Sequence, residues 1–171
     1  MKLTDKLSHA FDQQITLELS AAVVYRQLSI AMGVADLPGL AQWLRAQSDE
    51  EVVHADKFIT HVVDRQGSPK IGAIEAPKVK ADATPQDVFA AALAHEEKVS
   101  EAIRNLYRLA DAEGDLDSRP LLNWFLDEQI EEEATVGEIL AQIKMVGDDG
   151  PGLLRLDAEL GRRTGGGAEE A

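Results

Sequence analysis

Polar side chains interrupt the apolar stripe of a predicted helix at its centre. Within residues 37–66, stripe residues recur every three or four positions, which is the period of one face of an α-helix. The stripe consists of Leu40, Leu44, Gln47, Glu51, His54, Phe58 and Val62. Glu51 and His54 lie one turn apart on this face, so a carboxylate and an imidazole take positions where such a helix buries leucines.

Three further segments, residues 4–33, 84–112 and 117–146, show the same period and the same interruption. The polar residues at the centres of their stripes are Glu18, Glu96, Gln129 and Glu132. The helical phase also separates neighbouring acids, because Glu51 falls on its stripe whereas Glu50 does not. In a bundle whose helices have aligned ends, these central groups meet at one level of the core.

The lengths of the connections predict how these four helices run. The first and third connections hold only a few residues, so each joins an antiparallel pair. The middle connection, residues 67–83, has no helical period and contains two prolines. Its roughly 17 residues reach about 55 Å when extended, more than the roughly 42 Å length of a helix of about 28 residues. The sequence therefore predicts an all-α, up-down-down-up four-helix bundle with one long crossover.

The length of the chain and its C-terminal segment complete the predicted organisation. Residues 1–171 are predicted to form a single domain, because this length suits one core. A short fifth helix is predicted over residues 152–160, with a leucine-rich face that we expect to contact other copies of the chain. The glycine-rich, acidic tail, residues 161–171, is predicted to be disordered.

Charge and composition exclude several classes of function. The formal net charge of −14 argues against nucleic acid and anionic membranes as partners and suits a protein that handles cations. Because the chain has no cysteine, disulfides, iron–sulfur clusters and thiol catalysis are excluded. The N-terminal segment has no apolar signal core and no long apolar run follows, so we expect no membrane association and a cytoplasmic location.

The central carboxylates predict a metal site. Four glutamates at one level of the core carry a charge of about −4 when ionised, and no lysine or arginine falls on an inward stripe before Arg65. Burying unpaired carboxylates costs several kcal/mol each, more than a marginally stable domain can carry. Two divalent cations would neutralise them, with His54 as a neutral nitrogen ligand. Oxygen-rich ligation with one imidazole suits iron, manganese or zinc, and spacing alone does not choose among them.

Several short motifs of this chain occur together in one known family. They are Leu17-Glu18-Leu19 followed by Tyr25, Glu50-Glu51-x-x-His54, Glu96, and Glu128-Gln129-x-Glu131-Glu132-Glu133. With them the chain resembles the non-haem bacterial ferritins from Leu3 to about Leu160. The resemblance implies a hollow shell of 24 subunits. It also implies that each bundle oxidises ferrous iron with dioxygen or hydrogen peroxide and passes ferric iron to an internal mineral.

The resemblance assigns the central residues to a di-iron centre that acts as a ferroxidase. It implies that Glu18, Glu51 and His54 hold the first iron, with Glu51 bridging to the second. Glu96 and Glu132 would complete the second iron site. Di-iron bundles of this kind commonly use four glutamates and two histidines as ligands. The last long helix of this chain departs from that pattern, because it carries a glutamine and a glutamate three residues apart instead of a second Glu-x-x-His pair.

Other residues receive secondary roles from the same resemblance. Gln129 would lie beside the two irons, and Glu50, Glu128 and Glu131 would form a third, weaker iron site towards the cavity of the shell. For these three acids the alternative is a solvated acidic face. Tyr25 lies two turns beyond the first glutamate, and its side chain leans back towards the N-terminus, so its hydroxyl could reach the metals. The alternative is a core tyrosine whose hydroxyl is satisfied.

The sequence also separates this chain from related proteins and leaves a second function open. Haem-bearing bacterioferritins carry a haem-ligating methionine just after the bridging glutamate, where this chain has Val52, so we expect no haem. The alternative to a ferroxidase is a structural or interaction bundle whose acidic core holds a static metal without turnover. Adding ferrous iron to the apo-protein in air distinguishes the two, because only a ferroxidase produces ferric absorbance rapidly.

Overall fold

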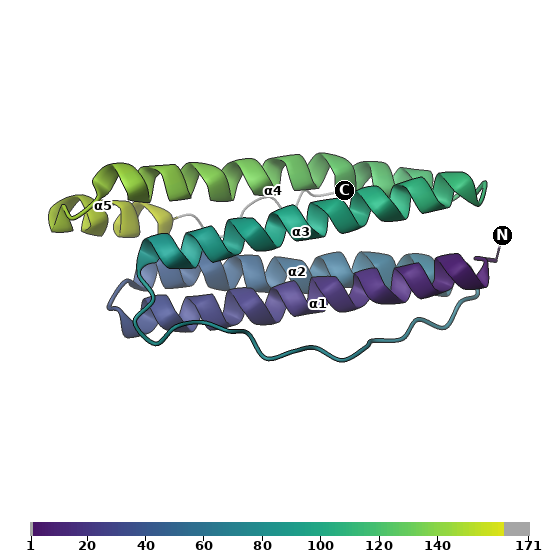
Figure 1. The fold of residues 1–171 in the computed structure, drawn as a ribbon, viewed down its shortest axis with the longest axis horizontal. Helices are drawn as coiled ribbons and strands as arrows, with labels where there is room; N and C mark the ends of the chain where they lie inside the picture. Colours follow the sequence, from purple (N-terminus) through teal and green to yellow (C-terminus); the bar gives the residue numbers. More distant parts are fainter. Residues whose placement is uncertain (1, 163–171) are drawn as a thin grey trace.

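The computed structural model describes residues 2–162, and every regular element within them is a helix (Figure 1). The helices are α1 (Asp5–Val34), α2 (Pro38–Asp64), α3 (Pro85–Ala112), α4 (Arg119–Val146) and α5 (Gly150–Leu160). Their ends lie within two residues of the predicted ones. Residues 163–171, most of the tail predicted to be disordered, lie outside the described residues.

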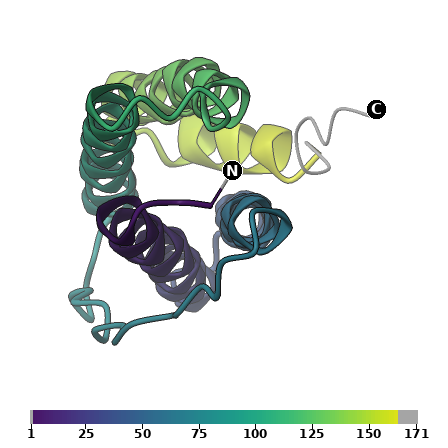
Figure 2. The ribbon, with the colours of Figure 1, turned by 90° about the vertical axis from the view of Figure 1, so that its right-hand side faces the viewer.

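The four long helices form a bundle in which α1 runs antiparallel to α2 and α3 runs antiparallel to α4 (Figures 1 and 2). The crossover between α2 and α3 runs the length of the bundle beside α1 (Figure 1). Two hydrogen bonds hold it there: the Lys70 N–H donates to Asp12 and the Gly72 N–H donates to Thr16, both at 2.8 Å. The parallel course of α2 and α3 confirms the predicted up-down-down-up topology with one long crossover.

The apolar core is divided into two clusters that lie on either side of the central polar level. One cluster, at the end that carries α5, includes Leu28, Leu44 and Phe89. The other, at the opposite end, includes Phe11 and Phe58. This division places the polar residues of four helices between two packed apolar regions. Within residues 2–162, none of the helices has the length and apolar character needed to cross a membrane.

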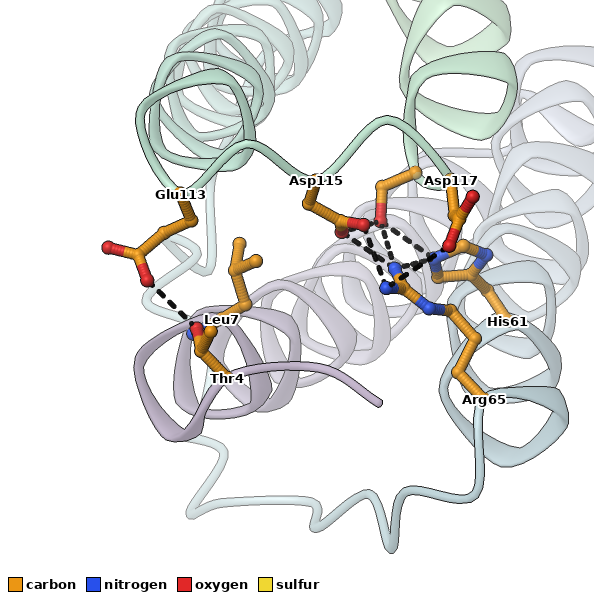
Figure 3. Close-up of polar contacts among 8 residues, drawn as sticks. Thr4, Leu7, His61, Arg65, Glu113, Asp115 and Asp117 are labelled. Carbon is orange, nitrogen blue, oxygen red and sulfur yellow. Dashed lines mark hydrogen bonds and ion pairs between the residues drawn. The ribbon is translucent and has the colours of Figure 1, made fainter. Parts of the chain in front are cut away.

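The loop between α3 and α4 is tied to the end of α2 by a largely buried ion pair (Figure 3). The Arg65 guanidinium donates to both carboxylate oxygens of Asp115, at 2.6 and 2.7 Å. Ser118 accepts from the same guanidinium and donates to Asp115 at 2.6 Å, and His61 contacts its hydroxyl at 2.8 Å. His61 therefore belongs to this connection.

Helix α5 packs against its own bundle rather than presenting all its leucines to other copies. Leu156 and Leu160 are buried in the adjacent apolar cluster, whereas Leu154 is exposed. Its Asp157 also completes the start of α2, because the Leu40 N–H donates to the Asp157 carboxylate at 2.8 Å and α2 has no side-chain cap of its own. At least half of the leucine-rich face predicted to contact other copies therefore packs within the subunit.

We expect Asp157→Ala to lower the free energy of unfolding by about 1–2 kcal/mol, because a buried N–H of the first turn of α2 loses its acceptor. Urea or thermal unfolding of the metal-free protein measures this change. Glu159→Ala, on an exposed position of the same helix, is the matched control and should leave stability within about 0.5 kcal/mol. Equal stability of the two variants would contradict the capping role.

Candidate metal centre

Six polar residues from four helices are buried at the middle of the bundle. Each is at most 7% exposed, and they are Glu18, Glu51, His54, Glu96, Gln129 and Glu132. They are the central stripe residues that the sequence selects. The helical phase therefore identifies correctly which polar groups face the core, including Glu51 rather than its partly exposed neighbour Glu50.

Three of these residues form a compact donor set. One ligand atom from each of Glu18, Glu51 and His54 lies within 4.8 Å of the others. His54 Nδ1 is 3.4 Å from a carboxylate oxygen of Glu51. The second carboxylate oxygen of Glu18 is buried and has no hydrogen-bond partner. A buried carboxylate oxygen without a partner is costly, so this donor set fits a bound cation better than an empty core.

A second donor set lies beside the first and shares its imidazole. Ligand atoms of Glu50, His54, Glu128 and Glu132 lie within 4.8 Å of one another. Glu50 and Glu128 are only partly buried, so this set reaches from the core towards the surface. Glu131, which the sequence grouped with these acids, is exposed and belongs to neither donor set.

Glu96 belongs to neither donor set, and each of its two oxygens accepts a hydrogen bond from an uncharged donor. The buried Tyr25 hydroxyl donates a short hydrogen bond to Oε1, and Gln129 Nε2 donates to Oε2 at 3.2 Å. Ser100 accepts a hydrogen bond from the same amide at 3.2 Å. The Tyr25 hydroxyl is therefore satisfied within the core, and the group that accepts its hydrogen bond is one of the predicted iron ligands.

Two glutamines contact the central carboxylates, and the sequence assigned them no role. Gln14 Nε2 donates to Glu18 at 2.8 Å. Gln47 Nε2 donates to both oxygens of Glu132, at 3.0 and 3.2 Å. Both glutamines lie on the inward stripes one turn before an acid, which is the signal that could have found them. The partner of Gln47 lies on another helix, so that contact could not be read from the period.

Burial raises the pKa of each central carboxyl group above its ordinary value. For Glu18 and Glu51 the pKa lies well above that value, because burial is reinforced by neighbouring carboxylates. Burial, followed by repulsion from Glu96 and the second donor set, raises the pKa of Glu132 to about 9. Burial, followed by repulsion from Glu96, Glu132 and Glu51, raises the pKa of the Tyr25 hydroxyl well above its ordinary value. The site therefore favours positive charge, from protons or from metal ions.

Comparison with known proteins identifies the family of this chain. A sequence model of the Ferritin family, described as a ferritin-like domain, matches residues 9–146. A bacterial non-heme ferritin of Bacteroides fragilis is 33% identical over 161 residues, which cover 94% of this chain and 99% of the relative. This chain belongs to the ferritin family. A Staphylococcus aureus bacterial non-heme ferritin is 31% identical over 162 residues, covering 95% and 97% of the two chains.

Solved ferritin structures share the fold of the described part of the chain. An engineered closed form of the Archaeoglobus fulgidus ferritin has a TM-score of 0.92 and 33% identity, covering 95% of this chain and 98% of its own. A humanized archaeal ferritin has a TM-score of 0.93 and 30% identity, covering 97% and 100%. The ferritin resemblance and the predicted all-α bundle with a short fifth helix are confirmed.

We expect the metal-free ferritin chain to lose stability as the pH rises from about 5 to about 8. The folded pKa of Glu132, about 9, lies above the unfolded value of about 4.3, so the folded state binds more protons between these values and its stability falls with pH. Glu132→Gln should flatten this dependence and raise the melting temperature at pH 8, since an amide oxygen can still accept from Gln47.

Thermal unfolding of chelator-treated protein at several pH values tests this prediction. In a chain of this size, each change of about 1 kcal/mol in the free energy of unfolding shifts the melting temperature by about 2–4 °C. Glu97→Gln, on the exposed face of α3, is the control and should leave the pH dependence unchanged. A Glu132→Gln variant that melts lower than the wild type at pH 8 would contradict the argument from buried repulsion.

Proposed function

We propose that this chain is an iron-storage ferritin with ferroxidase activity. In this proposal each bundle oxidises ferrous iron, and the ferric product is stored as a mineral. The observation that carries the proposal is the buried donor set of Glu18, Glu51 and His54, whose ligand atoms lie within 4.8 Å of one another. A second acidic donor set adjoins it and offers places for further cations. Family membership supports iron as the metal.

The proposed ligand assignment places two irons side by side. The first would be held by Glu18, Glu51 and His54, and Glu51 would bridge to the second. Glu132 and Glu96 would complete the second site. Each oxygen of Glu96 accepts a hydrogen bond, from Tyr25 or from the Gln129 amide, and keeps a lone pair that could face a cation.

A pair of sites suits the chemistry of ferrous oxidation. Each ferrous ion gives up one electron, so two ions supply the two electrons that convert dioxygen and two protons to hydrogen peroxide. Two further ferrous ions supply two more electrons, which together with two protons convert hydrogen peroxide to two water molecules. Carboxylates suit both oxidation states of iron because they are hard, anionic donors. The carboxyl groups, whose pKa values burial raises, would release protons when the cations bind.

The second donor set supports a third iron position. Glu50 and Glu128 lie beside Glu132 and are only partly buried, so they lead from the paired sites towards the surface. We assign this position to Glu50 and Glu128. Glu131 is predicted from the sequence to share this position, but its side chain is exposed and lies outside the donor set. We therefore leave Glu131 out of the assignment and use its substitution to test that choice.

The proposal includes assembly into a shell of 24 copies without haem. Similar Archaeoglobus fulgidus structures are described as an open-pore ferritin and an engineered closed form, which favours a shell for this chain. The absence of haem and the cytoplasmic location stay predictions from the sequence. Light scattering after size exclusion should give 24 times the mass of one chain, and the absorbance spectrum should lack a haem band.

We expect Glu18→Ala and His54→Ala each to lower the rate of ferrous oxidation by at least about 100-fold, because each removes a ligand of the first iron. Stopped-flow absorbance of ferric iron in air measures the rate. His9→Ala and Glu97→Ala, at exposed positions, are the matched controls and should oxidise iron at the wild-type rate. Both site variants should remain helical and assembled.

The same measurement separates the two candidate functions. If the wild type binds ferrous iron without oxidising it, the chain holds a static metal and is a structural or interaction bundle. If the site variants keep the wild-type rate, oxidation takes place elsewhere and the ligand assignment is wrong.

We expect Glu50→Ala combined with Glu128→Ala to leave the first rapid phase of oxidation unchanged. The stoichiometry of that phase should fall from about three irons per subunit towards two, because the partly buried acids of the second donor set are removed. Titration with ferrous iron in air measures the stoichiometry. Glu131→Ala is the control, and an equal effect of that variant would restore Glu131 to the site and contradict the present assignment.

A further inference from the structure

A half-open groove lies between α1 and α3, on the side of the bundle away from the acidic donor set. It has a volume of about 270 Å³ and is lined by Ala10, Gln13, Gln14, Leu17, Ala102, Asn105, Leu106 and Leu109. None of these eight residues is ionisable. The mouth carries the exposed amides of Gln13 and Asn105, and small alanine side chains on both walls leave its space open.

The groove and the metal centre share one contacting residue, Gln14. Gln14 lines the groove, is only 3% exposed, and donates to Glu18 at 2.8 Å. Side chains of a helix lean towards its N-terminus, so the Glu18 carboxylate lies over the turn that carries Gln14. The other oxygen of this carboxylate is buried without a partner. Gln14 therefore links the lining of the groove to a ligand of the first donor set.

The two approaches to the centre differ in charge. Glu50 and Glu128, on α2 and α4, present carboxylates and attract a cation. The groove between α1 and α3 presents only amides and apolar side chains. A hydrated ferrous ion gains no counter-charge there and would lose part of its water shell, whereas a small uncharged molecule has no such cost.

We infer that the groove between α1 and α3 admits the uncharged oxidant, dioxygen or hydrogen peroxide, while ferrous iron enters from the acidic side. This inference rests on the proposed ferroxidase function. The bundle would then have a separate path for each of its two substrates. The oxidant would reach a loaded pair of ferrous ions without crossing the path by which iron enters.

Filling the groove tests this inference. Ala102→Phe fills it from α3, and Ala10→Leu fills it from α1. Both alanines are only partly buried, so larger side chains can lie in the groove without entering the packed core. Ala94→Phe, on an exposed position of α3 outside the groove, is the matched control. The proteins are loaded anaerobically with ferrous iron and then mixed with dioxygen or with hydrogen peroxide over a range of concentrations.

We expect both groove variants to bind ferrous iron anaerobically as the wild type does. Their second-order rate constants with the oxidant should fall about tenfold, equivalent to about 1.4 kcal/mol in the barrier. Slowing with one oxidant alone identifies that oxidant as the molecule the groove admits, and slowing with both assigns it to small uncharged oxidants in general. The Ala94→Phe control should keep the wild-type rate constants.

Two results would overturn the inference while leaving the ferroxidase intact. One is an unchanged rate with both oxidants in folded groove variants. The other is slower anaerobic binding of ferrous iron with an unchanged oxidant dependence, which would make the groove a path for iron. A wild-type chain that oxidises no ferrous iron contradicts the proposed function, and this inference with it.

Discussion

The structure depends on a layer of buried carboxyl groups between two apolar cores. Each ionised, unpaired carboxylate at this depth costs several kcal/mol, against a total stability of about 5–15 kcal/mol for a typical domain. Uncharged donors contact this layer and offset part of that cost. Gln14, Gln47 and Gln129 each donate an amide to a different acid, and Tyr25 donates its hydroxyl to Glu96.

The uncharged character of these donors matters for function. A lysine or arginine in the same places would neutralise the acids more fully, but it would also repel an incoming cation. The described part of the chain keeps its buried guanidinium, that of Arg65, at the end of the bundle, where Asp115 and Ser118 engage it. Amides instead hold the carboxylates in place without adding charge, so the site still attracts divalent ions. Stability is therefore lower in the metal-free state and is restored when cations bind.

Much of the fold and part of the site could be predicted from the sequence because both follow from local periodicity. The three- and four-residue spacing identified the long helices, and the length of residues 67–83 identified the crossover. The same phase separated buried Glu51 from partly exposed Glu50. Contacts between helices could not be obtained in this way. The period places Gln47 and Glu96 on inward faces but does not indicate that their partners are Glu132 and Tyr25.

The remaining differences have the same physical origin. Whether α5 contacts its own bundle depends on the close approach of Gly39, where an added Cβ atom would lie 1.8 Å from the carbonyl oxygen of Asp157. No pattern within α5 encodes that approach. Glu128 and Glu131 likewise lie three residues apart on α4, and the resulting difference of about 60° in helical phase separates a partly buried acid from an exposed one. Periodicity thus determines which faces meet, whereas individual contacts across those faces determine which carboxylates lie close together and which side chains keep them in place.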